Sequence, residues 1–117
     1  MTDNLLAQVR AHCLSLPNAT EELTWGHPTF RIGGKIFATS GAGADGRASC
    51  GCKTSREHQA VLVQRPGFSV ADYVGRYGWV TIELDGSVEI SEIRALITDS
   101  WRQIAPRRLV KAFDARA

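Results

Sequence analysis

The stretch Thr29-Phe30-Arg31-Ile32-Gly33-Gly34-Lys35-Ile36-Phe37-Ala38-Thr39 decides the fold of this 117-residue chain. Apolar and polar residues alternate on both sides of the glycine pair, which is the two-residue period of a β-strand. A glycine pair between two such runs indicates a two-residue turn, because turns of the primed type need positive φ angles that glycine adopts without steric cost. We therefore predict an antiparallel hairpin with Arg31 and Lys35 beside its turn.

Residue spacing and turn signals predict further elements around this hairpin. An amphipathic helix occupies the N-terminal segment and stops at Pro17. Thr54 and Glu57 form a capping box, which predicts a helix over residues 55–64, and Ser69 with Asp72 repeats that pattern for a short helix. The remaining elements are strands over residues 20–25, 47–53 and 79–84, a candidate return strand over 87–90, a helix capped by Ser91, and a basic helical segment from Pro106.

Together these elements predict an α+β fold, an antiparallel sheet flanked by helices in the order α-β-β-β-β-α-α-β-α. Strands linked by hairpins are antiparallel, so a doubly wound parallel sheet that binds a dinucleotide is excluded. The length, with 44% hydrophobic and 22% charged residues, predicts a single domain over residues 1–117. A basic C-terminal segment begins at about residue 105.

Hydropathy argues against a membrane protein. No stretch approaches the roughly 20 apolar residues that a membrane span needs. Asp3 and Arg10 lie where a signal peptide would have its apolar segment. We expect a cytoplasmic protein without a membrane partner.

Charge is distributed in blocks along the chain, although the formal net charge is only +2. The blocks carry −2 over residues 1–30, +4 over 31–76, −4 over 77–101 and +4 over 102–117. Such blocks either form ordinary solvated faces or create a one-sided potential that attracts an anionic partner. Which of these two alternatives applies depends on whether folding brings the two basic blocks together.

Two motifs suggest chemistry that their context does not support. Cys50 and Cys52 share one side of a predicted strand, but no Cys or His elsewhere completes a recognised zinc spacing, so we expect buried thiols and no metal. Residues 41–46 match G-x-G-x-x-G, yet a strand and not a helix follows, so we expect a connection between strands. No cofactor is expected.

The aromatic residues and His27 are expected to have structural roles. Trp79 begins a strand and Trp101 lies on the apolar stripe of a helix, so both are predicted to be core residues. His27 lies at a turn, where it is expected to bond to the backbone while Trp25 packs on the core. A catalytic role for His27 would require a neighbouring nucleophile or carboxylate.

The sequence resembles the MmcQ/YjbR family of small bacterial proteins over nearly its whole length. The resemblance lies in Leu16-Pro17, Thr20-Glu21-Glu22, the segment from Trp25 to Ala38, Trp79-Val80-Thr81-Ile82 and Ser100-Trp101, where the family commonly has Tyr in place of this Trp101. The positions that carry the family motif are Trp25, Gly26, His27, Pro28, Phe30, Gly34, Lys35, Phe37, Trp79 and Ser100. The resemblance implies a fold similar to frataxin-like and secretion-chaperone-like proteins, and DNA binding by a double wing.

Three functions remain as hypotheses. The first is a non-enzymatic module that binds DNA weakly and in a salt-dependent manner, since a basic hairpin and a helix start suit phosphate contacts. The second is a protein-interaction or chaperone-like module, and the third is a small enzyme or ligand binder centred on His27. The residues predicted to contact nucleic acid are Arg31, Lys35, Lys53, Arg56, Arg107, Arg108 and Lys111.

Overall fold

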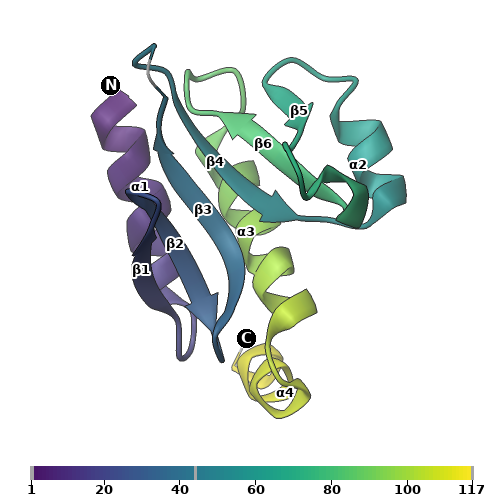
Figure 1. The fold of residues 1–117 in the computed structure, drawn as a ribbon. Helices are drawn as coiled ribbons and strands as arrows, with labels where there is room; N and C mark the ends of the chain where they lie inside the picture. The colour runs from purple at the N-terminus through teal and green to yellow at the C-terminus, as the bar shows by residue number, and fades with distance from the viewer. Residues whose placement is uncertain (1, 44, 117) are drawn as a thin grey trace.

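A computed structural model describes residues 2–43 and 45–116. Its strands form one antiparallel sheet in the order β1-β2-β3-β4-β6-β5 (Figure 1). The elements are α1 (Thr2–Ser15), β1 (Thr20–Thr24), β2 (His27–Ile32), β3 (Lys35–Ala42), β4 (Ala48–Lys53), α2 (Arg56–Leu62), β5 (Phe68–Val70), the 3-10 turn η1 (Gly75–Tyr77), β6 (Trp79–Glu83), α3 (Ile90–Ile104) and α4 (Arg107–Ala115). The α+β class and the antiparallel sheet predicted from the sequence are confirmed.

The predicted hairpin is present. Ile32 pairs with Lys35, and the two glycines between them have φ angles of 60° and 82°. The register shifts because Phe30 pairs with Ala38 and Arg31 pairs with Ile36, so Phe37 is the extra residue of a bulge in β3. β1 also pairs with β2, and β3 with β4, in the antiparallel direction. Residues 20–53 therefore form a meander of four consecutive strands.

One face of the sheet holds the hydrophobic core. Helices α1 and α3 contact each other and pack on β3 and β4, behind the sheet in Figure 1. Phe30, Phe37 and Trp101 are completely buried between these layers. Among residues 2–43 and 45–116, no helix covers the opposite face, which we call the open face (Figure 1). None of the described helices has the length and apolar character needed to span a membrane.

The short helix predicted after Ser69 is wrong. Residues 68–70 form the edge strand β5, which pairs Phe68 with Ile82 and Val70 with Val80, and only one 3-10 turn follows. Three residues carry too little periodicity to identify a strand, and their extended conformation depends on pairing with β6. The predicted element order therefore lacks this strand.

Two helix starts and one candidate strand also differ from the sequence prediction. Ser55 and not Thr54 caps α2, because its hydroxyl accepts from the His58 amide at 3.0 Å. The candidate return strand at residues 87–90 is absent from the described chain, since Asp85 accepts from the Ser87 amide at 2.9 Å and the chain turns into α3. Helix α3 begins at Ile90, one residue before the predicted cap.

Candidate nucleic-acid interface

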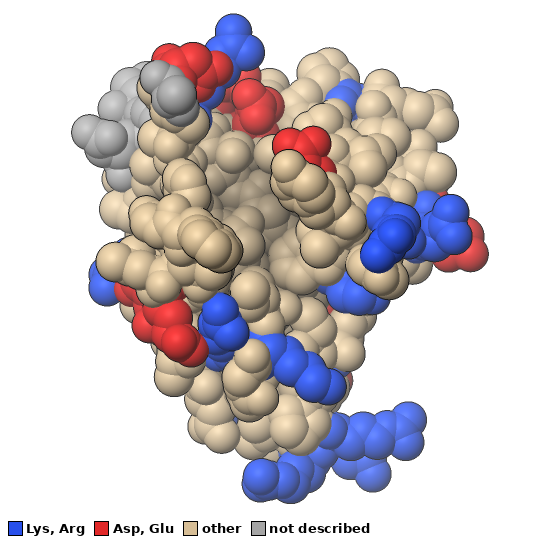
Figure 2. Space-filling model, viewed as in Figure 1, with Lys and Arg blue, Asp and Glu red and all other residues tan. Residues whose placement is uncertain are grey.

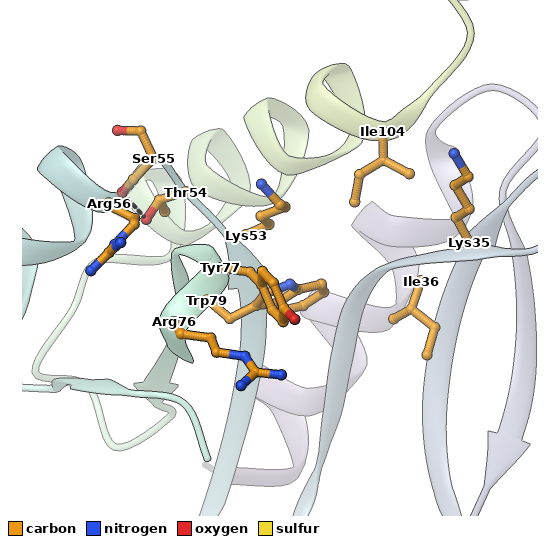
Figure 3. A pocket seen from close by; sticks show the side chains of 10 residues that line it. All are labelled: Lys35, Ile36, Lys53, Thr54, Ser55, Arg56, Arg76, Tyr77, Trp79 and Ile104. Carbon is orange, nitrogen blue, oxygen red and sulfur yellow. Dashed lines mark hydrogen bonds between the residues drawn. The ribbon is translucent and has the colours of Figure 1, made fainter. Parts of the chain in front are cut away.

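Four cationic side chains line one pocket of about 510 Å³, which we call the basic pocket (Figure 3). Lys35 begins β3, Lys53 ends β4, Arg56 begins α2, and Arg76 lies in η1. None of the described residues that line the pocket is acidic. Three of these cations are among the contact residues predicted from the sequence. Arg76 is not, because its position depends on how η1 packs beside β6.

The buried Ser100 of α3 fixes the ends of the two strands that carry the lysines. Its hydroxyl donates to the Phe37 carbonyl of β3 at 2.6 Å and accepts from the Lys53 amide of β4 at 2.9 Å. Gln103, one turn further along α3, donates to the Lys53 carbonyl at 3.0 Å. The family-motif serine thus holds the backbone at the base of the pocket, and Lys53 projects from a fixed position.

The opposite wall of the pocket depends on contacts of η1 and the residue that follows it. Thr54 donates both its amide and its hydroxyl to the Gly78 carbonyl. Gln59 of α2 donates through Nε2 to the Gly75 carbonyl at 2.7 Å and to the Trp79 carbonyl at 2.8 Å. These bonds attach η1 to α2 and β4, so Arg76 and Arg56 face the same pocket.

Two aromatic rings lie between the cations. Tyr77 is 53% exposed and its ring lies 4.9 Å from the Arg76 guanidinium carbon. In Figure 3, Tyr77 and Trp79 separate Lys35 from Arg56 and Arg76. The prediction that Trp79 is a core residue is wrong: Val80 is completely buried on the core side, and strand alternation places Trp79 on the open face. Alternation along β6 does not by itself show this from the sequence, because it does not tell which face of the sheet the helices cover.

Arg31 does not line the basic pocket. Its side chain is only 23% exposed, and its Nε lies 3.4 Å from Glu22 Oε2. Its Nη2 also donates to Thr24 Oγ1 at 3.1 Å. Arg31 therefore ties β2 to β1, whereas Lys35, on the other side of the same turn, lines the pocket.

The other predicted contact residues, Arg107, Arg108 and Lys111, are exposed on α4 and do not line the basic pocket. Helix α4 lies at the end of the molecule where the β2–β3 turn is found (Figure 1). Ile104, the last residue of α3, lines the pocket just before α4 begins. Folding thus brings four of the seven basic residues of the middle block together and leaves the C-terminal block as a neighbouring exposed surface.

Trp25 does not pack on the core, contrary to expectation. It is 95% exposed and has a φ of 55° in the turn between β1 and β2. A residue at the tip of a two-residue turn projects beyond the sheet and meets no partner layer. His27 is exposed beside it, with its ring over the backbone of Gly41.

The cysteines behave as predicted for buried thiols. Cys13, Cys50 and Cys52 lie on the core side of the sheet, opposite to His27. Burial raises the pKa of both Cys13 and Cys52 to about 12, so neither is a thiolate at neutral pH. No group of three His, Cys, Asp or Glu side chains is placed to hold a metal ion within residues 2–43 and 45–116. The connection predicted over residues 41–46 does lie between β3 and β4, but it spans residues 43–47, because Gly41 and Ala42 belong to β3; Ala44 lies outside the described residues.

An open-faced antiparallel sheet, backed by two helices and carrying a basic pocket at one end, defines this molecule. The YjbR family model matches residues 14–103, and the chain belongs to that family. A search of curated proteins finds no match.

Two solved structures share the fold. A Deinococcus radiodurans protein with the family domain DUF419 is 22% identical, with a TM-score of 0.72 over 81% of this chain and 74% of its own. A structural-genomics target from Pseudomonas syringae is 20% identical, with a TM-score of 0.65 over 84% of this chain and 93% of its own.

Proposed function

We propose that this protein is a non-enzymatic DNA-binding module that contacts phosphates through Lys35, Lys53, Arg56 and Arg76. The observation that carries the proposal is the convergence of these four cations, from four separate elements, on one pocket without an acidic lining residue. Arginine and lysine supply most protein contacts to nucleic-acid phosphates, and these contacts position the protein without reading sequence. The proposal implies a location in the cytoplasm, where bacterial DNA lies.

The hairpin takes part through only one of its two basic residues. Lys35 is exposed and faces the pocket, whereas the Arg31 guanidinium is held by Glu22. The exposed cations of α4 lie at the same end of the molecule and would attract DNA over a longer distance. Their contacts with phosphates would have little fixed geometry. Binding of this kind is weak and sensitive to salt, because its free energy comes from released counterions.

Salt dependence provides the quantitative test. If each of the four cations neutralises one phosphate, log K should fall with log salt concentration with a slope of about −3.6 for a duplex and about −2.8 for a single strand. The measurement is fluorescence anisotropy of a labelled oligonucleotide at several salt concentrations. The double variant K53E/R76E is expected to bind too weakly to measure.

A matched control is available at the other end of the sheet. Arg47 is exposed between β3 and β4 and pairs only loosely with Asp45, at 3.7 Å. Arg47→Glu reverses one charge away from the basic pocket, as each of the two substitutions in K53E/R76E does within it, and is expected to leave most of the binding intact. Absence of binding at low salt, or equal losses in K53E/R76E and R47E, would overturn the proposal; a stoichiometric protein partner recovered without nucleic acid would then favour an interaction module.

A further inference from the structure

A groove crosses the open face beside the basic pocket. Its floor is a row of small residues that the strand register places side by side: Thr29 pairs with Thr39, Thr39 with Gly51, Gly51 with Thr81, and Thr81 with Ser69. No large side chain rises from this row. Figure 2 shows the resulting hollow at the centre of this face, with an uncharged floor and with Lys and Arg side chains gathered below it and to one side.

The groove is continuous with the basic pocket. An adjoining hollow of about 420 Å³ shares Ile36 and Trp79 with that pocket. It shares Thr39 and Asp72 with an outer hollow of about 570 Å³. A linear ligand that enters the basic pocket can therefore extend along the sheet without leaving the protein surface.

The outer hollow is bordered by two aromatic side chains in unusual conformations. Trp25 and Tyr73 line it, and they are 95% and 96% exposed. Both have left-handed backbones, with φ angles of 55° and 64°. Side chains that large neither favour such a backbone nor stabilise the fold when solvated, and backbone strain of this kind is concentrated at binding sites. Two of them at one hollow indicate a surface that a flat ligand would cover.

We propose that the groove binds single-stranded nucleic acid, with backbone phosphates at the basic pocket and the following bases on the open face between Trp25 and Tyr73. This inference rests on the proposed function and names the form of nucleic acid. Stacking on aromatic side chains requires bases that are not already paired and stacked in a duplex.

The charge distribution supports a single strand over a duplex. The cations lie at one end of the groove, its floor is neutral, and the carboxylate of Asp72 borders both hollows. A duplex would place phosphates along the groove, against Asp72 and without cations to neutralise them. A single strand can turn its bases toward the groove and its backbone toward solvent.

The test compares the binding of a labelled single strand of about 12 nucleotides with the binding of the duplex of the same sequence. This length lies within the range of known single-strand sites, and the sequence is chosen without self-complementarity. The variants are Trp25→Asn and Tyr73→Asn, because asparagine tolerates the left-handed backbone and removes only the ring. Leu23→Ala is the control: Leu23 is 74% exposed on β1 and lines neither hollow. Thermal unfolding verifies that each variant folds.

We expect tighter binding of the single strand, and a loss of about tenfold in each asparagine variant, as for other base–aromatic contacts. Duplex binding should change less than about twofold, and Leu23→Ala should have no effect on either. Duplex binding equal to that of the single strand, or single-strand binding unchanged in both asparagine variants, would overturn this inference. If the aromatic variants gave such a result but K53E/R76E still abolished binding, the proposed function would stand without the single-strand inference. If neither the single strand nor the duplex bound at low salt, both the proposed function and this inference would be overturned.

Discussion

Thr54 and Gly78 are joined by two hydrogen bonds to one carbonyl: the Thr54 amide and hydroxyl donate to the Gly78 oxygen at 2.8 and 2.7 Å. The side chain of Thr54 is buried at this contact. The pair links the end of β4 to the start of β6, and the wall of the basic pocket that holds Arg76 is built on it.

Gly78→Ala should destabilise the protein by about 2–4 kcal/mol, since it combines backbone strain with a steric clash. Gly78 has a φ of 94°, and a Cβ there would collide with the Thr54 carbonyl oxygen. Gly86 is the control, because its φ is 91° but a Cβ added there would meet no atom within 4 Å. Urea denaturation should show a loss of about 1–2 kcal/mol for Gly86→Ala; equal losses would contradict the role assigned to the Thr54 contact.

Ser100→Ala should lower the free energy of unfolding by about 1–3 kcal/mol, because it leaves a buried donor or acceptor without a partner. The lost bonds are those to the Phe37 carbonyl and the Lys53 amide. The same substitution at Ser91, exposed on α3, should change stability by less than about 0.5 kcal/mol. Hydrogen exchange should also show faster exchange of the Lys53 amide in Ser100→Ala, and an unchanged rate would contradict this account.

Stability should decrease as the pH falls below about 6.5, the ordinary pKa of histidine. Burial, and then the charge of Arg94, lower the pKa of His12, whose Nε2 lies 2.8 Å from Thr98 Oγ1. Both the folded and the unfolded chain hold a neutral His12 above pH 6.5, so its contribution is complete there and is lost as the pH falls through the lower pKa of the folded state. Thermal unfolding at pH 7.5 and pH 5 should show a smaller difference in His12→Gln than in the wild type. An equal difference in both proteins would remove His12 as the cause.

The thiols should not react in the folded protein. Burial raises the pKa of Cys13 and Cys52 to about 12 and raises that of Cys50 as well. At pH 8 a thiol reagent should therefore modify none of the three cysteines until the chain unfolds, and then all of them. Reaction of one cysteine at the rate of a free thiol under native conditions would contradict the burial of that residue.

The sequence predicted the elements whose signal is local. The hairpin around Gly33 and Gly34 follows from alternation and turn chemistry, and the amphipathic stripe of α3 follows from helical periodicity. β5 was missed because three residues form a strand only against β6. Arg76 was missed for a related reason: nothing near it in the chain indicates that Thr54 and Gln59 place η1 beside Lys53.

The burial of aromatic residues could not be predicted from the sequence for a different reason. Large apolar side chains are usually buried, and that general tendency placed Trp25 and Trp79 in the core. Trp25 occupies a turn tip and Trp79 the face of β6 that has no helix over it. Which face of a sheet is covered depends on where α1 and α3 pack, and alternation along a single strand does not contain that information.

Because one face of the sheet is uncovered, residues of the same strand contribute alternately to the core and to the open surface. In β4 and β6, Cys50, Cys52, Val80 and Ile82 fill the core, while their neighbours Gly51 and Thr81 face the groove. Substitutions at alternate positions therefore act on different quantities: one set changes the free energy of folding, and the other changes what the surface accepts. A scaffold divided in this way can acquire a new ligand through changes on one side of its sheet while the residues that hold it together stay the same.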